Sequence, residues 1–85
     1  MEYYYITYKY EDWQPIHRIN KYGGVEYYNR YRRDWWAVSY VTPEELRKCI
    51  KDEEPIQMND GSKAEVKTIT SEEVEGLLMM MELNR

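Results

Sequence analysis

The chain contains no phenylalanine, one cysteine and one histidine among its 85 residues. A single thiol cannot form an internal disulfide, which excludes the disulfide-stapled class of small secreted domains and favours the cytoplasm. The one histidine has no cysteine or histidine companion at ligand spacing, so the common zinc motifs are excluded. The longest apolar run, residues 77–81, is too short to cross a bilayer. The first residues include neither a basic nor an apolar stretch, so we expect no secretory signal.

Sequence motifs for catalysis and cofactor binding are missing as well. Gly23 and Gly24 precede a strand pattern, so their amides do not open a phosphate-binding helix. Cys49 falls near the C-terminal end of an expected helix, where the dipole disfavours a thiolate, and we expect a buried structural thiol. We expect His17 to be solvated or hydrogen bonded, and the acids within residues 52–60 lack the spacing of a calcium loop. The sequence therefore predicts no catalytic residue, no metal and no cofactor.

Length and charge predict one domain over residues 1–85. A chain of this size buries roughly 60 to 65% of its unfolded surface and holds one modest core. The net charge of −4 is divided unevenly: residues 1–40 carry six Lys/Arg against five Asp/Glu, and residues 41–85 carry six against eleven. Adhesion of the whole molecule to nucleic acid is therefore not expected, although a local basic patch is still an option.

The aromatic residues are all tyrosine or tryptophan, ten and three respectively, and all lie within the first forty residues. These side chains combine apolar area with a polar group, which suits half-wet binding surfaces better than a dry core. Their alternation with β-branched and polar residues predicts four short strands, at Glu2–Tyr10, Trp13–Asn20, Val25–Tyr31 and Asp34–Val41. A helix over residues 26–36 is the alternative, which aromatic crowding disfavours.

Proline and glycine mark how these strands begin and connect. Pro15 lacks an amide donor, which places its segment at a sheet edge or at the start of a strand. Gly23-Gly24 and Asp60-Gly61 provide the positive φ angles of tight turns. The second turn predicts a hairpin between Ile56–Met58 and Lys63–Thr70.

Two capping patterns predict helices. Thr42-Pro43-Glu44-Glu45 begins a helix that runs to about Asp52, and Thr70 or Ser71 caps a C-terminal helix. The apolar stripe of the second helix faces the sheet and consists of Val74, Leu77, Leu78 and Met81. The sequence thus predicts a small α+β domain in which an antiparallel meander of about four strands is followed by a helix, a β hairpin and a C-terminal helix packed on the sheet.

Residues 27–36 interleave rings and guanidinium groups, the side chains that dominate protein-binding hot spots. The same side chains can hold single-stranded nucleic acid, but the acidic total charge and the missing RNA-recognition signatures favour a protein partner. A third interpretation is that alternate rings pack inward while the arginines are solvated. The candidate protein-binding residues here are Tyr27, Tyr28, Arg30, Tyr31, Arg32, Arg33 and Trp35.

The C-terminal helix has more apolar residues than one buried stripe needs. Met79, Met80 and Leu83 fall on its flank, where flexible methionines suit contact with another protein or with a second copy in a homodimer. A wide buried stripe is the alternative. We expect a non-enzymatic cytoplasmic adaptor or inhibitor that binds another protein and no membrane, with single-stranded nucleic-acid binding as the alternative function. Its size and composition also match phage and mobile-element products that block host enzymes, by analogy alone.

Overall fold

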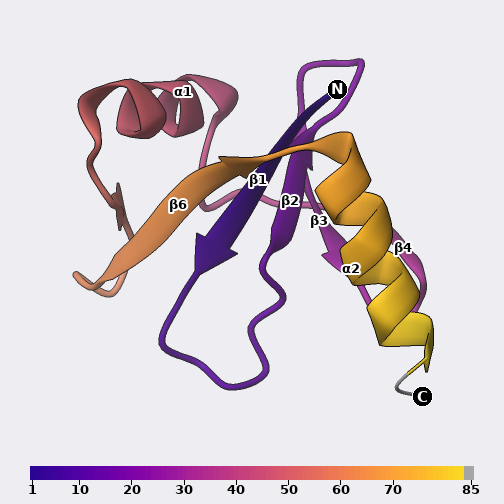
Figure 1. The fold of residues 1–85 in the computed structure, drawn as a ribbon. Helices are drawn as coiled ribbons and strands as arrows, with labels where there is room; N and C mark the ends of the chain where they lie inside the picture. The colour runs from indigo at the N-terminus through magenta and orange to yellow at the C-terminus, as the bar shows by residue number, and fades with distance from the viewer. Residues whose placement is uncertain (84–85) are drawn as a thin grey trace.

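The computed structural model describes residues 1–83 and shows six antiparallel strands in one sheet with two helices (Figure 1). The strands are β1 (Glu2–Thr7), β2 (Ile16–Ile19), β3 (Val25–Asn29), β4 (Asp34–Ala37), β5 (Ile56–Gln57) and β6 (Lys63–Ile69). The helices are α1 (Pro43–Asp52) and α2 (Ser71–Leu83). The predicted α+β fold class and the order of its elements are confirmed.

The strand order across the sheet is β4-β3-β2-β1-β6-β5. The last strand returns to pair with the first, with Lys67 opposite Tyr5. Both β1 and β2 are therefore interior strands, and Pro15 marks the start of β2 and not a sheet edge. The sheet ends at β4 on one side and at the two-residue β5 on the other.

The predicted strands are too long because aromatic alternation continues past the residues that pair. After Thr7 the chain leaves the sheet, and the rings of Tyr8 and Trp13 pack edge to face at 5.1 Å in the connecting loop. Residues 26–36 form β3, a turn and β4, so the helical alternative for this segment is wrong. In that turn Asn29 Oδ1 accepts hydrogen bonds from the backbone amides of Tyr31 and Arg32, and Arg33 takes a left-handed conformation with φ of 56°.

Both helices begin at reciprocal caps. The Glu45 amide donates to Thr42 Oγ1 at 3.1 Å, while the Thr42 amide donates to Glu45 Oε1 at 3.3 Å. In α2 the cap is Thr70, not Ser71: the Glu73 amide donates to Thr70 Oγ1 at 3.1 Å and the Thr70 amide donates back to the Glu73 side chain at 3.0 Å. Each cap satisfies amides that the helix itself leaves unpaired, so both starts are fixed locally.

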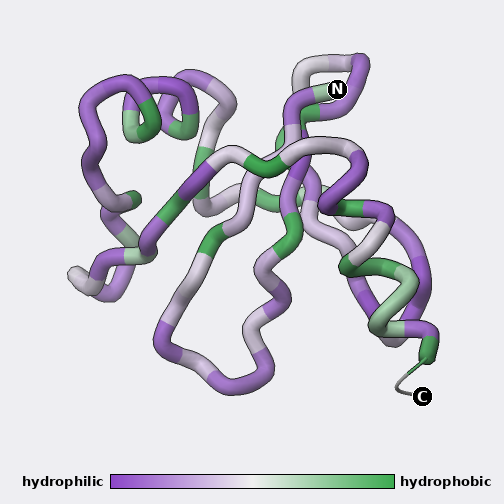
Figure 2. Tube along the Cα trace, viewed as in Figure 1, coloured by the Kyte–Doolittle hydropathy of each residue, from purple (hydrophilic) through white to green (hydrophobic). Residues whose placement is uncertain are grey.

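The two helices cover opposite faces of the sheet, because neighbouring residues of a strand point to opposite sides. Leu46 of α1 is fully buried against Ile6 of β1 and the residues that share that face. Val74 of α2 is buried against the other face, with Ile16 and Ile69. Figure 1 shows the helices well separated, and Figure 2 shows hydrophobic residues recurring along α2 to its C-terminal end. The protein therefore has two small apolar clusters, one on each side of the sheet.

Candidate functional site

The hairpin formed by β3 and β4 carries the seven candidate residues of segment 27–36, and it directs them to different sides. Tyr27 points to the α1 side, where its ring lies 6.3 Å from that of His17. Tyr28 and Trp35 point to the α2 side and form an edge-to-face pair at 5.4 Å. The turn between the strands leaves four of the candidate residues exposed: Arg30, Tyr31, Arg32 and Arg33. The segment is therefore a hairpin edge with an exposed tip and not one continuous aromatic face.

The arginines at this tip already contact neighbouring side chains. Arg30 lies over the Tyr31 ring at 4.9 Å, and Arg32 lies over the Trp36 ring at 6.0 Å. Arg33 Nε lies 3.4 Å from Glu82 Oε1, which connects the hairpin tip to α2. The guanidinium groups are therefore positioned, with their charge partly used within the molecule. A partner that binds here would meet ordered Arg and aromatic pairs.

The second group of candidate residues lines one flank of α2. Met79, Met80 and Leu83 are 66%, 59% and 81% exposed. With Glu73, Gly76 and Leu77 they form one wall of a groove of about 760 Å³, and its other wall comprises Tyr5, Lys67 and Ile69. Residues two positions apart in an α-helix are separated by about 200° around the helix axis. Met80 and Glu82 therefore lie on opposite flanks of α2. The groove and the hairpin tip are therefore two separate surfaces.

One acid and one base line this groove, Glu73 and Lys67. The helix Ser71–Leu83 contains four glutamates and neither lysine nor arginine. The single cation that lines the groove is Lys67, whose Nζ lies 5.4 Å from the centre of the Tyr5 ring. The groove thus combines an apolar wall with one acidic and one basic side chain, beside a helix whose charged residues are all glutamates.

The edge of β6 beyond β5 is open, which the sequence did not reveal because it depends on strand order. β5 pairs only with Lys63 and Ala64. The Met58 amide donates to the Ser62 carbonyl, and antiparallel alternation then directs the backbone groups of Val66 and Thr68 to the same outer side. No strand among residues 1–83 pairs with them there. A cavity of about 310 Å³ adjoins this edge and includes Ile50, Glu53 and Glu54 in its lining.

A smaller pocket lies on the α1 side of the sheet, next to the fully buried His17. The imidazole Nδ1 lies 2.9 Å from the Pro15 carbonyl oxygen, and Nε2 is hydrogen bonded to the Tyr40 hydroxyl. Burial lowers the His17 pKa to about 4, so the ring is neutral at physiological pH. Of the two expectations for His17, the hydrogen-bonded one is correct and the solvated one is wrong.

The one thiol and the Asp60 carboxylate both form hydrogen bonds within the described chain. Cys49 is half-buried, its Sγ donates to the Pro55 carbonyl oxygen at 3.6 Å, and burial raises the thiol pKa. Asp60 sits in a turn, where its hydrogen bonds with the Lys9 ammonium and with Ser62 hold its pKa well below the usual range. Within residues 1–83, no three His, Cys, Asp or Glu side chains gather as a metal site would require.

No protein-family model matches the chain, and comparisons with curated proteins and with solved structures give no match. In the described part of the chain, neither helix has the length and apolar character needed to cross a membrane. Function is therefore inferred from the residues of this chain alone.

Proposed function

We propose that this protein is a non-enzymatic cytoplasmic binding module, an adaptor or inhibitor, that captures another protein by accepting an extended segment at the open edge of β6. The observation that supports this most strongly is the position of Val66 and Thr68. Their outward backbone groups have no strand partner within residues 1–83, and the exposed wall that includes Met80 stands beside the same strand. Strand addition at such an edge is a common form of peptide recognition.

Both sides of an added strand would find contacts. Side chains alternate between the two faces of a strand, so one set would enter the groove between Lys67 and Met80. The other set would meet the cavity beside Ile50 and Val66. Backbone hydrogen bonds to Val66 and Thr68 would supply affinity, while the two grooves would select the side chains.

The charge of the surroundings defines the chemistry of the partner. Glu53, Glu54 and Glu65 line the cavity beside the edge, and Glu73 lines the groove on the other face. Lys67 is the one base common to both. Charge complementarity therefore favours a partner segment that alternates apolar residues with lysine or arginine. The hairpin residues Tyr31 and Arg32 remain the second predicted contact for a larger partner.

Selection of peptides from a random display library on the immobilised protein tests this proposal. We expect selected peptides to be basic and apolar and to bind the Met80→Asp variant at least about tenfold more weakly, because the charge destroys the apolar wall. The matched control is Tyr22→Asp, at an exposed residue on the β2–β3 turn. Peptides that bind Met80→Asp as tightly as the unaltered protein would contradict the proposal.

A second copy of the chain is the competing occupant of the same groove. Light scattering at low micromolar concentration distinguishes the two. The proposal predicts a monomer that binds the selected peptides. A dimer that Met80→Asp converts to a monomer would instead assign the groove to self-association.

A further inference from the structure

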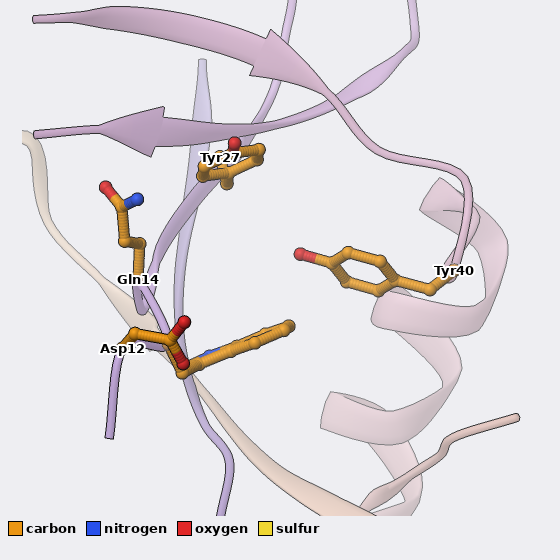
Figure 3. Close-up of a pocket in the computed structure, with 5 residues that line it drawn as sticks. Asp12, Gln14, Tyr27 and Tyr40 are labelled. Carbon is orange, nitrogen blue, oxygen red and sulfur yellow. The ribbon is translucent and has the colours of Figure 1, made fainter. Parts of the chain in front are cut away.

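The pocket beside His17 is separate from the docking edge of β6, and different residues line it. It measures about 280 Å³, and its lining consists of Asp12, Trp13, Gln14, Tyr27 and Tyr40. Figure 3 shows the Tyr40 hydroxyl directed toward the middle of the pocket, with Tyr27 on another side and Asp12 and Gln14 along the rim. Three aromatic rings and one carboxylate therefore line an open pocket that fits a chemical group smaller than a drug-sized ligand, whose pockets begin at about 300 Å³.

The aromatic walls are fixed by hydrogen bonds at their polar ends. Trp13 Nε1 donates to the Ile6 carbonyl oxygen at 2.8 Å, and the Tyr40 hydroxyl is bonded to His17. The Trp13 and Tyr40 rings lie 5.3 Å apart at an interplanar angle of 52°, so they form an angled wall and not a stacked pair. A ligand would meet rings already in place and would not have to order them.

The electrostatics of the pocket favour a cation. Seven other rings in the described chain already have a lysine or arginine above them, as Trp35 has Arg18 at 4.1 Å, whereas no such cation lies over the three pocket rings. The Asp12 carboxylate forms no hydrogen bond or ion pair with residues 1–83. The rings, the Tyr40 hydroxyl and this carboxylate thus line the pocket together, and no lysine or arginine of residues 1–83 lies over the three rings.

The groups behind the rings do not oppose a cation. The His17 ring lies against all three pocket rings, and its burial keeps it neutral at physiological pH. Gln14 Oε1 accepts a hydrogen bond from the Arg30 backbone amide at 2.6 Å, which holds the rim in place. This bond uses one of the two acceptor sites of the oxygen.

We propose that this pocket binds an N-methylated ammonium group between Trp13, Tyr27 and Tyr40, with the Asp12 carboxylate as counter-ion. A simple ammonium would give up its hydrogen bonds to water and find one free carboxylate in return. A trimethylammonium donates no hydrogen bonds, so its methyl groups can lie on the rings without that loss. The group could belong to a small quaternary amine or to a methylated lysine side chain.

Titration with tetramethylammonium chloride, followed through the Trp13 indole N–H resonance, tests the pocket directly. We expect a saturable shift and binding at least about tenfold tighter than that of 3,3-dimethylbutan-1-ol, a neutral compound of similar shape. Choline and a trimethyllysine peptide form two further arms, and the tighter of the two identifies the source of the group. No shift at high millimolar tetramethylammonium, or equal binding of the neutral compound, would overturn the proposal.

Variants separate the pocket from general effects on the fold. Asp12→Asn should weaken tetramethylammonium binding several-fold, while the neighbouring Glu11→Gln should leave it unchanged. Tyr27→Leu should abolish binding, and Tyr31→Leu, on the same hairpin but outside the pocket, should not. Because Asp12 is exposed and its carboxylate forms no hydrogen bond or ion pair within residues 1–83, its variant should fold normally. Unchanged binding by folded Asp12→Asn and Tyr27→Leu would refute the assignment.

Discussion

The imidazole of His17 accepts a hydrogen bond from the hydroxyl of Tyr40. The direction follows from the opposite side of the ring, because the Pro15 carbonyl oxygen, 2.9 Å from Nδ1, can only accept. The proton is therefore on Nδ1, and Nε2 is the acceptor. This pair connects β2 to the segment that leads into α1, and it fixes Tyr40 in the wall of the pocket.

Burial of the neutral His17 predicts a loss of stability in mild acid. The native pKa of about 4 lies below the ordinary value of 6.5, so the unfolded chain binds a proton first as the pH falls. The groups that face the ring, Tyr27, Tyr40 and Trp13, are uncharged. We expect the free energy of unfolding to drop by about 2 kcal/mol from pH 7 to pH 5. Urea unfolding at both pH values measures this drop, and His17→Gln should remove most of it.

Substitutions at Leu46 and Leu83 should distinguish a loss of stability from a loss of peptide binding. Leu46 is fully buried under α1, so Leu46→Ala should cost about 2 to 5 kcal/mol through lost burial and the cavity it leaves. Leu83 is 81% exposed, and Leu83→Ala should leave the free energy of unfolding unchanged while weakening binding of selected peptides in the α2 groove. Thermal unfolding of both variants provides the comparison. Equal losses of stability would show that Leu83 belongs to the core.

Local sequence signals were sufficient to predict the order of the elements. Thr42 and Glu45 specify the start of α1 within four residues, and Gly61 has the positive φ of 84° that its turn requires. Strand ends were less predictable, because the alternation of Tyr8 and Tyr10 continues after pairing stops. A strand ends where its neighbour ends, and that depends on the tertiary structure.

The candidate sites could be predicted only in part, for the same physical reason. The exposure of Met79, Met80 and Leu83 agrees with the helical spacing, since each falls outside the stripe that faces the sheet. The open edge of β6 requires knowing that β6 lies beside β1. The pocket requires Asp12, Tyr27 and Tyr40 to meet from three segments, and no sequence spacing encodes that meeting.

Cys49 should react slowly with thiol reagents in the native protein. Its side chain is half-buried, it donates to the Pro55 carbonyl, and burial raises its pKa, so little thiolate forms at neutral pH. We expect labelling at pH 7.5 to be at least about tenfold slower than in the urea-unfolded chain. Native labelling as fast as in urea would instead indicate a reactive thiol and would reopen an enzymatic interpretation.

If the hairpin tip bound nucleic acid, its affinity would depend on salt more strongly than its affinity for a protein would. Contacts to phosphates release counterions, so affinity for a single-stranded oligonucleotide would fall steeply with salt. Because Arg30, Arg32 and Arg33 already contact Tyr31, Trp36 and Glu82, we expect weak oligonucleotide binding even at low salt. Fluorescence anisotropy with a labelled oligonucleotide measures it. Tight, strongly salt-dependent binding that Arg32→Ala abolishes would favour the nucleic-acid function.

Hydrogen exchange at the outer edge of β6 tests the proposed docking most directly. The amides of Val66 and Thr68 should exchange rapidly in the free protein, whereas the Lys67 amide, which points to β1, should already be protected. Addition of a selected peptide should slow exchange at Val66 and Thr68 and leave Lys67 unchanged. A bound peptide that leaves the exchange of these two amides unaltered would contradict strand addition at this edge.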